Sequence, residues 1–180
     1  MSKYSLQIIT LFLALSSFCS DAFAFKSPAK IAVVNVQSIM DNSTAMIDVR
    51  ASTENIAKDL QSKFAKIQAD LHAEEKNIME LKDKLKPEEF EVKATAFDAK
   101  VTKAQKSMQE EKLKLEQAHA TAINEVNEIA LKIIESISKR HGVDLVLPST
   151  NVLYASESLN ITKEVLDKMN QTIPKIKLKL

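Results

Sequence analysis

The sequence predicts a mainly helical fold: a long antiparallel coiled-coil hairpin on a small body of short strands that subunits share. The 180 residues include one glycine and no tryptophan, whereas an average chain of this length has roughly a dozen glycines. Apolar residues recur at alternating spacings of four and three through the middle of the chain, which is the period of a coiled coil. Short β-branched runs, typical of strands, lie at both ends of this middle region.

The first 24 residues have the pattern of a secretory signal peptide. Lys3 supplies a positive start, Leu6–Leu15 is mostly apolar, and Ala22–Ala24 matches the small-x-small cleavage pattern. The apolar run is too short to span a membrane as a helix. We therefore expect residues 1–24 to be removed after Ala24 and the rest to be exported; the alternatives are an uncleaved anchor and, because of Cys19, a lipoprotein.

Residues 25–44 and 141–180 are predicted to form the two parts of the body. Short β-branched or apolar runs predict strands at Ile31–Val36, Val143–Leu147 and Asn151–Ala155. Asn160 can cap a helix that runs from residue 161 to about residue 170. After Pro174 the tail alternates basic and apolar residues, and we expect it to fray; the alternative is contact with the membrane or with the body.

Residues 45–140 are predicted to form the helical hairpin. The heptad places these residues on its seam: Leu60, Phe64, Ile67, Leu71, Ile78, Leu81, Leu85, Phe90, Phe97, Val101, Met108 and Leu115. Only Glu74 and Glu111 interrupt the pattern with a charge. Pro87 suits the first position of a second helix, so we place the turn there. This pairing of the two helices sets Arg50 opposite Glu125.

The apolar stripe widens near the end of the second predicted helix. Two paired helices bury only a narrow seam, and the short strands cannot make a stable core alone. A wide stripe is typical of a helix that packs against more than one neighbour. We therefore predict a subunit interface formed by Ile31, Val33, Val126, Ile129, Ile133, Ile134 and Ile137.

Composition excludes several classes of function. A single glycine, Gly142, cannot build a phosphate-binding loop, a dinucleotide fingerprint or a nucleophile elbow. The 25 basic and 24 acidic residues give a net charge of +1 and no case for nucleic-acid binding. The three histidines are too scattered to indicate a metal or catalytic site. We therefore expect neither enzymatic activity nor a cofactor or metal.

Four apolar residues lie outside the seam of the predicted hairpin. They are Met46, Met79, Val92 and Leu113. Methionine is flexible and suits surfaces that bind many partners. These residues are therefore candidate contacts for a partner, although ordinary surface scatter would give the same pattern.

The two ends of the exported chain resemble the Skp/OmpH family of periplasmic chaperones. The resemblance rests on Lys30–Val36, Val143–Leu147, Asn151–Ala155 and Ile161–Leu166 around a long charged hairpin. It implies a periplasmic homotrimer with a small β-barrel body and three helical arms. It also implies that the arms enclose unfolded outer-membrane proteins without ATP and so prevent their aggregation. The alternative is a structural coiled-coil spacer or stalk of the cell envelope.

This chain departs from the strongly basic character of the best-known family members. From Glu74 to Lys100 it has six lysines against eight acidic residues. The resemblance therefore carries over no lipopolysaccharide or basic-tip site. Membrane contact has no support beyond the basic and apolar tail at Lys175–Leu180.

Overall fold

The computed structural model describes residues 28–179. The chain divides into two units, Met1–Lys30 and Ile31–Leu180, and the fold described here is that of the second unit. The predicted signal peptide and its cleavage after Ala24 lie outside the described residues. The final residue, Leu180, also lies outside them.

The described residues form one small sheet of two parallel strands. Strand β1 (Ile31–Val34) pairs with β2 (Leu145–Pro148), with Ile31 opposite Leu145. Within the described residues the sheet is parallel and does not close into a barrel, so the barrel-like body shared between subunits stays a prediction. The strand predicted at Asn151–Ala155 is also not formed, because a 3-10 turn covers Ser149–Asn151 and the next residues pair with no described strand.

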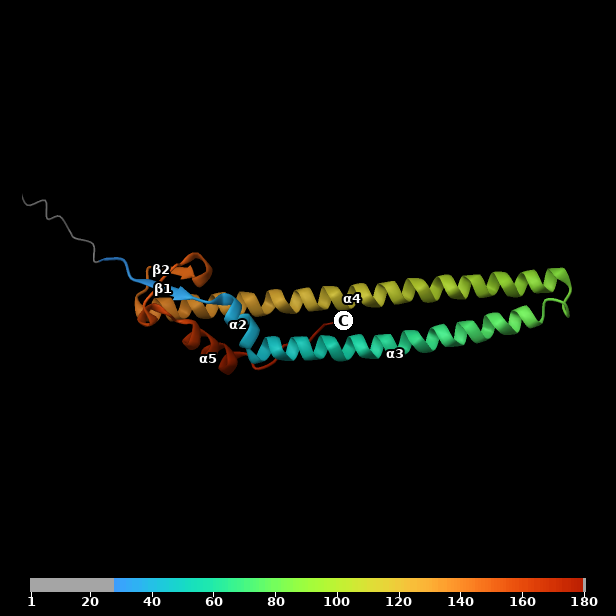
Figure 1. The fold of residues 1–180 in the computed structure, drawn as a ribbon, viewed down its shortest axis with the longest axis horizontal. Helices are drawn as coiled ribbons and strands as arrows, with labels where there is room; N and C mark the ends of the chain where they lie inside the picture. The colour runs from blue at the N-terminus through green and yellow to red at the C-terminus, as the bar shows by residue number, and fades with distance from the viewer. Residues whose placement is uncertain (1–27, 180) are drawn as a thin grey trace, which may run out of the picture. The chain divides into compact units, whose positions relative to one another are not determined.

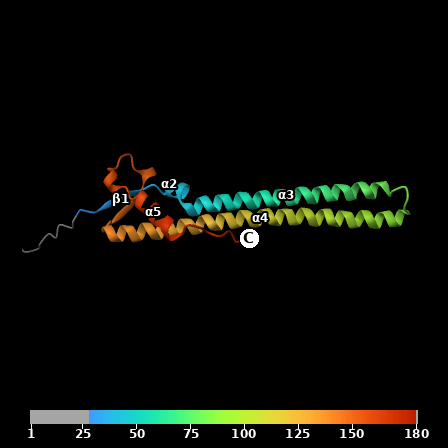
Figure 2. The same ribbon diagram turned by 90° about the horizontal axis from the view of Figure 1, so that it is seen from below.

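Most of the described chain is helical, and two long helices dominate it. Helix α3 (Thr44–Glu80) and helix α4 (Pro87–His141) lie side by side and are joined by residues 81–86 (Figure 1). At 1.5 Å per residue they are about 55 and 80 Å long. Figure 2 shows the same pair from a second direction. Lys63 contacts Glu111 and Glu74 contacts Lys100, so the two helices run in opposite directions.

Local signals explain where the long helices begin and end. The Ser43 hydroxyl accepts a hydrogen bond from the Met46 amide, 3.3 Å away, and caps the start of α3. Helix α4 begins at Pro87, whose missing N–H costs nothing at this position. It ends at Gly142, which adopts the left-handed conformation with φ of 63°.

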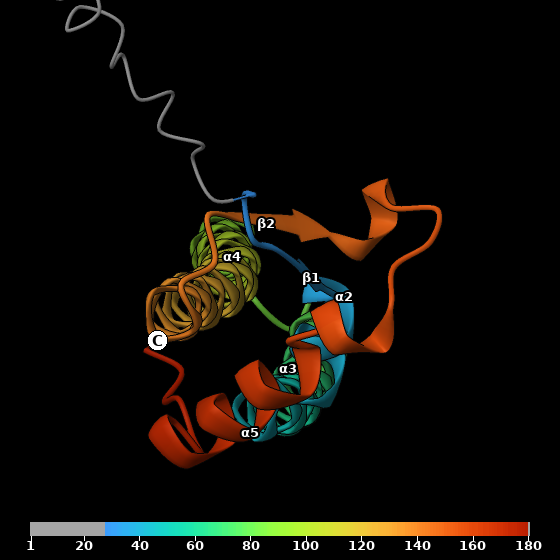
Figure 3. The ribbon, with the colours of Figure 1, turned by 90° about the vertical axis from the view of Figure 1, so that its left-hand side faces the viewer.

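The hydrophobic core lies at the base of the two long helices. Two shorter helices, α2 (Val36–Asn42) and α5 (Thr162–Thr172), pack there against α3 and α4 (Figure 3). The core includes Ile39, Val49, Val126, Ile137, Val165 and Met169, all of them buried. Helix α2 follows β1 directly, where the sequence interpretation extended the strand to Val36.

Candidate functional site

The two long helices contact each other along one seam. The predicted seam residues, Leu60, Phe64, Ile67, Leu71, Ile78, Leu81, Leu85, Phe90, Phe97, Val101, Met108 and Leu115, are all buried or half-buried. Between residues 57 and 110 every residue outside the heptad positions is exposed. The two long helices, called the arms from here on, therefore pack against each other along one narrow stripe. The rest of their surface between residues 57 and 110 is exposed to solvent.

The two charged residues on the seam are each paired across it. Lys63 Nζ donates to Glu111 Oε1 at 2.6 Å, and Lys100 donates to Glu74. Each lysine comes from the helix opposite its glutamate, and both glutamates are less exposed than their lysine partners. A polar residue on a coiled-coil seam is tolerated when it fixes the register of the two helices, and these pairs can do so.

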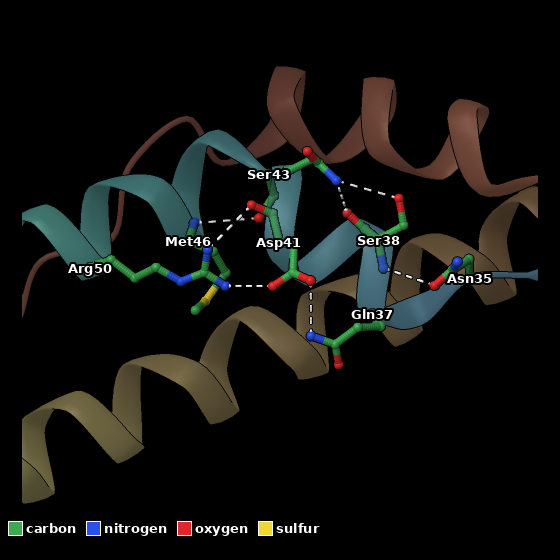
Figure 4. Close-up of polar contacts among 8 residues, drawn as sticks. Asn35, Gln37, Ser38, Asp41, Ser43, Met46 and Arg50 are labelled. Carbon is green, nitrogen blue, oxygen red and sulfur yellow. Dashed lines mark hydrogen bonds and ion pairs between the residues drawn. The ribbon is translucent and has the colours of Figure 1, made fainter. Parts of the chain in front are cut away.

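The corner between α2 and α3 is held by polar contacts near the base (Figure 4). Arg50 Nη2 donates to Asp41 Oδ1 at 2.7 Å, and Gln37 Nε2 donates to Asp41 Oδ2 at 3.0 Å. The hydrogen bonds from Gln37 and then Arg50 lower the pKa of the Asp41 carboxyl. The expected pairing of Arg50 with Glu125 is therefore corrected, because Arg50 turns back to the corner.

The four candidate contact residues do not form one group. Met79, Val92 and Leu113 lie on the arms with 60%, 70% and 49% of their surface exposed. Met46 is only 4% exposed and belongs to the core. The prediction for Met46 as a surface contact is therefore wrong: at the first turn of α3 its side chain packs inward.

The predicted subunit interface lies largely inside the chain's own core. Val33, Val126, Ile133, Ile134 and Ile137 are buried within a single chain, and Ile129 packs against the same cluster. Ile31 alone is exposed. The interpretation of this stripe as a subunit interface is corrected. The wide apolar stripe of α4 is covered by α2, α3 and α5 of the same chain.

The body does expose large apolar side chains elsewhere. Leu145, Leu153, Tyr154 and Leu159 are exposed and lie on or after β2. The sequence feature that pointed to this exposed surface is the β-like run predicted as a strand at Asn151–Ala155. Such a run stays exposed when no strand of its own chain pairs with it. The sequence prediction placed this run in the body and the subunit interface largely on α4, and it did not single out these exposed side chains.

A groove also follows the seam midway along the arms. Its volume is about 560 Å³, and its apolar lining consists of Leu71, Phe97, Val101, Ala104 and Met108.

Among the residues that the structure describes, no helix has an apolar stretch long enough to cross a membrane.

The residues that match a known family span most of this architecture. A family model described as outer membrane protein (OmpH-like) matches residues 30–169, from the residue before β1 into α5. The chain belongs to the OmpH-like family. The Chaperone protein Skp of Photorhabdus luminescens is 31% identical, over 82% of this chain and 92% of the relative. The Chaperone protein Skp of Yersinia enterocolitica is 28% identical, over 82% and 90%.

A solved structure shares the fold. An OmpH-like outer membrane chaperone from Caulobacter crescentus superposes with a TM-score of 0.76, over 86% of this chain and 94% of that chain. Its sequence identity is 16%, so the likeness concerns the fold. Together, the family match and the named relatives place this protein in a family of chaperones.

Proposed function

We propose that this protein is an ATP-independent holdase of the periplasm that binds unfolded outer-membrane proteins and prevents their aggregation. The observation that carries the proposal is the pair of long helices, which use a single stripe for packing and leave long surfaces free, in a chain of a chaperone family. Binding the unfolded state suppresses aggregation by mass action. Weak contacts spread along several arms add avidity without requiring a client sequence.

Clients are held by dispersed apolar contacts rather than by charge. The exposed side chains of Met79, Val92 and Leu113 supply such contacts on the arms. The arms are close to neutral, and salt screens charges beyond about 8 Å at physiological ionic strength. Client affinity should therefore change less than about tenfold between roughly 50 and 500 mM salt.

The working unit is a homotrimer assembled through the body. The exposed apolar residues Ile31, Leu145, Leu153 and Tyr154 lie around a two-stranded sheet. Its β1 edge is bridged at Val33 by Asn160, whereas its β2 edge pairs with no described segment. An open edge offers unpaired backbone groups to a strand of another chain. The extended segment after Asn151 is suited to such pairing, so the barrel predicted from the sequence would require more than one chain.

The proposal is tested by titrating a fluorescently labelled, denatured outer-membrane barrel protein with the exported chain and following anisotropy. The triple variant Met79→Ser, Val92→Ser, Leu113→Ser should bind more weakly while circular dichroism stays unchanged. A matched control changes three exposed polar neighbours to serine: Asn77, Lys93 and Gln109. Equal loss in both variants, or no binding by the unmodified protein, would contradict the proposal.

A further inference from the structure

The chain continues beyond α5 into a tail that folds back on the core. The family model ends at residue 169, so Pro174–Lys179 lie outside the matched region. Ile176 is nevertheless 7% exposed and belongs to the same buried cluster as Val126 and Met169. Leu178 packs against that cluster as well. Figures 1 and 2 show the tail running from α5 back along the base of the two long helices.

The tail is extended and alternates between two kinds of side chain. Ile176 and Leu178 face the core, whereas Lys175, Lys177 and Lys179 are exposed. This period of two follows from an extended backbone, in which successive side chains point to opposite faces. Pro174 lacks an amide hydrogen, and its ring disfavours continuation of α5. The tail was expected to fray; instead its apolar positions are covered.

Side chains alone hold the tail in place. Within residues 28–179, no backbone–backbone hydrogen bond involves Pro174–Lys179, and the last one before the tail joins Ile173 to Met169. None of the three lysines forms an ion pair with a described carboxylate. Two apolar side chains on an otherwise unpaired segment form a contact that another segment of similar chemistry can replace.

The alternation in the tail is also that of a membrane-spanning β-strand. Strands of outer-membrane barrels alternate apolar residues facing lipid with polar residues facing the interior. Unfolded chains of that class therefore carry many extended segments with an apolar residue at every second position. The chain's own tail has this pattern and is seated on an apolar site at the base of the arms.

We propose that this site binds extended, alternating apolar segments of unfolded outer-membrane proteins and that the tail is a built-in competitor which such segments displace. The inference rests on the proposed function and deepens it by naming the segment that is recognised. A protein whose site is partly occupied binds with an apparent affinity reduced by the free fraction. The tail is seated in this structure, with Ile176 buried, so we expect removal of the competitor to tighten client binding by about three- to tenfold.

The first test compares tail variants in the anisotropy titration. Deletion of residues 174–180 and the double variant Ile176→Ser, Leu178→Ser should both bind client about three- to tenfold more tightly. The matched control changes the three lysines to serine and leaves the apolar contacts in place, so its affinity should equal that of the unmodified chain. Unchanged or weakened binding in the serine double variant would overturn the inference, as would tightening caused by the lysine variant alone.

A second measurement follows the tail itself. The exported chain has no cysteine, so Lys179→Cys gives a single site for an environment-sensitive fluorophore. Saturating client should change its emission to that of the label on the double variant Ile176→Ser, Leu178→Ser, in which the tail is released. Client binding without any change in emission would show that the tail stays seated and would overturn the inference.

A peptide competition covers the case in which a tail variant folds poorly. On the unmodified chain, a peptide of residues 173–180 should release labelled client, and a peptide of the same composition with its lysines consecutive should release less. If the two peptides act equally, the alternation is not recognised and the inference is wrong. If the unmodified chain binds no client, the proposed function is wrong. If it binds client and the tail variants bind client equally well, only this inference is wrong.

Discussion

The glutamates on the seam of the arms allow a sharp test of how the two helices are held together. Glu111 lies on the seam with its side chain 27% exposed and is paired with Lys63 across it. Its neighbour Glu110 is 56% exposed and is paired with Lys106 of the same helix. The substitutions Glu111→Leu and Glu110→Leu are therefore chemically identical and differ only in the face of α4 on which they lie.

The expected effects follow from burial. Fully burying a leucine side chain contributes about 1.5–3 kcal/mol relative to leaving it exposed. A side chain about three quarters covered keeps roughly 1–2 kcal/mol of that, and the lost ion pair costs about 0–1 kcal/mol because both partners are partly exposed. Glutamate and leucine have similar helix propensities. We expect Glu111→Leu to raise the free energy of unfolding of the arms by about 1 kcal/mol, and Glu110→Leu to leave it within about 0.5 kcal/mol.

Urea unfolding followed by circular dichroism measures both variants against the unmodified chain. If Glu111→Leu destabilised the arms, the ion pair rather than apolar burial would hold this part of the seam. If both variants behaved alike, the distinction between seam and surface on α4 would be wrong. A variant with both Glu74→Leu and Glu111→Leu should gain stability at each site, and it should also lose the fixed register that the paired charges give.

Three further outcomes are expected at the base and in the corner. Ile133→Asp places an unpaired charge in the chain's own core, so it should abolish the folded body, seen as loss of the cooperative unfolding transition and not as dissociation alone. Gly142→Ala should lower stability by about 1 kcal/mol, because φ of 63° is unfavourable for alanine, and Gly142→Asn should cost less in the same thermal scan. Gln37 and Arg50 lower the pKa of the Asp41 carboxyl below its ordinary value of 3.8. The stability that these contacts give the fold is therefore complete above that pH and is lost as the pH falls through the lower folded-state pKa. Asp41→Asn should remove this acid dependence from urea unfolding measured at several pH values.

The sequence predicted the arms well because their stabilisation is local and periodic. Each seam position follows from a spacing rule, and the buried or half-buried state of Phe64, Leu71 and Leu115 needs no knowledge of distant segments. Pro87 marks the start of α4 and Gly142 its end, because each residue by itself restricts or permits a particular backbone conformation.

The body was harder to predict because its contacts join distant parts of the chain. A wide apolar stripe shows that Val126 and Ile137 are buried, but not whether the covering segment belongs to the same chain. Here α2, α3 and α5 cover it, and α2 was missed because its few apolar residues directly follow a strand. The seated tail was predicted to fray for a similar reason: the burial of Ile176 depends on a core built by segments from all parts of the described chain.

The same limit applies to the candidate contact residues. A position outside the heptad register correctly marks Met79, Val92 and Leu113 as exposed residues along the arms. It fails for Met46, because α3 passes from the arm into the body and acquires new neighbours there.

The most direct test of the proposed holdase function is light scattering from a denatured outer-membrane barrel protein diluted into buffer that contains the exported chain and no nucleotide. The proposed function predicts that scattering is suppressed as the chain is added, and that the triple serine variant of Met79, Val92 and Leu113 needs a higher concentration for the same suppression. Scattering that rises as fast as in buffer alone would contradict the central claim that these arms hold unfolded proteins.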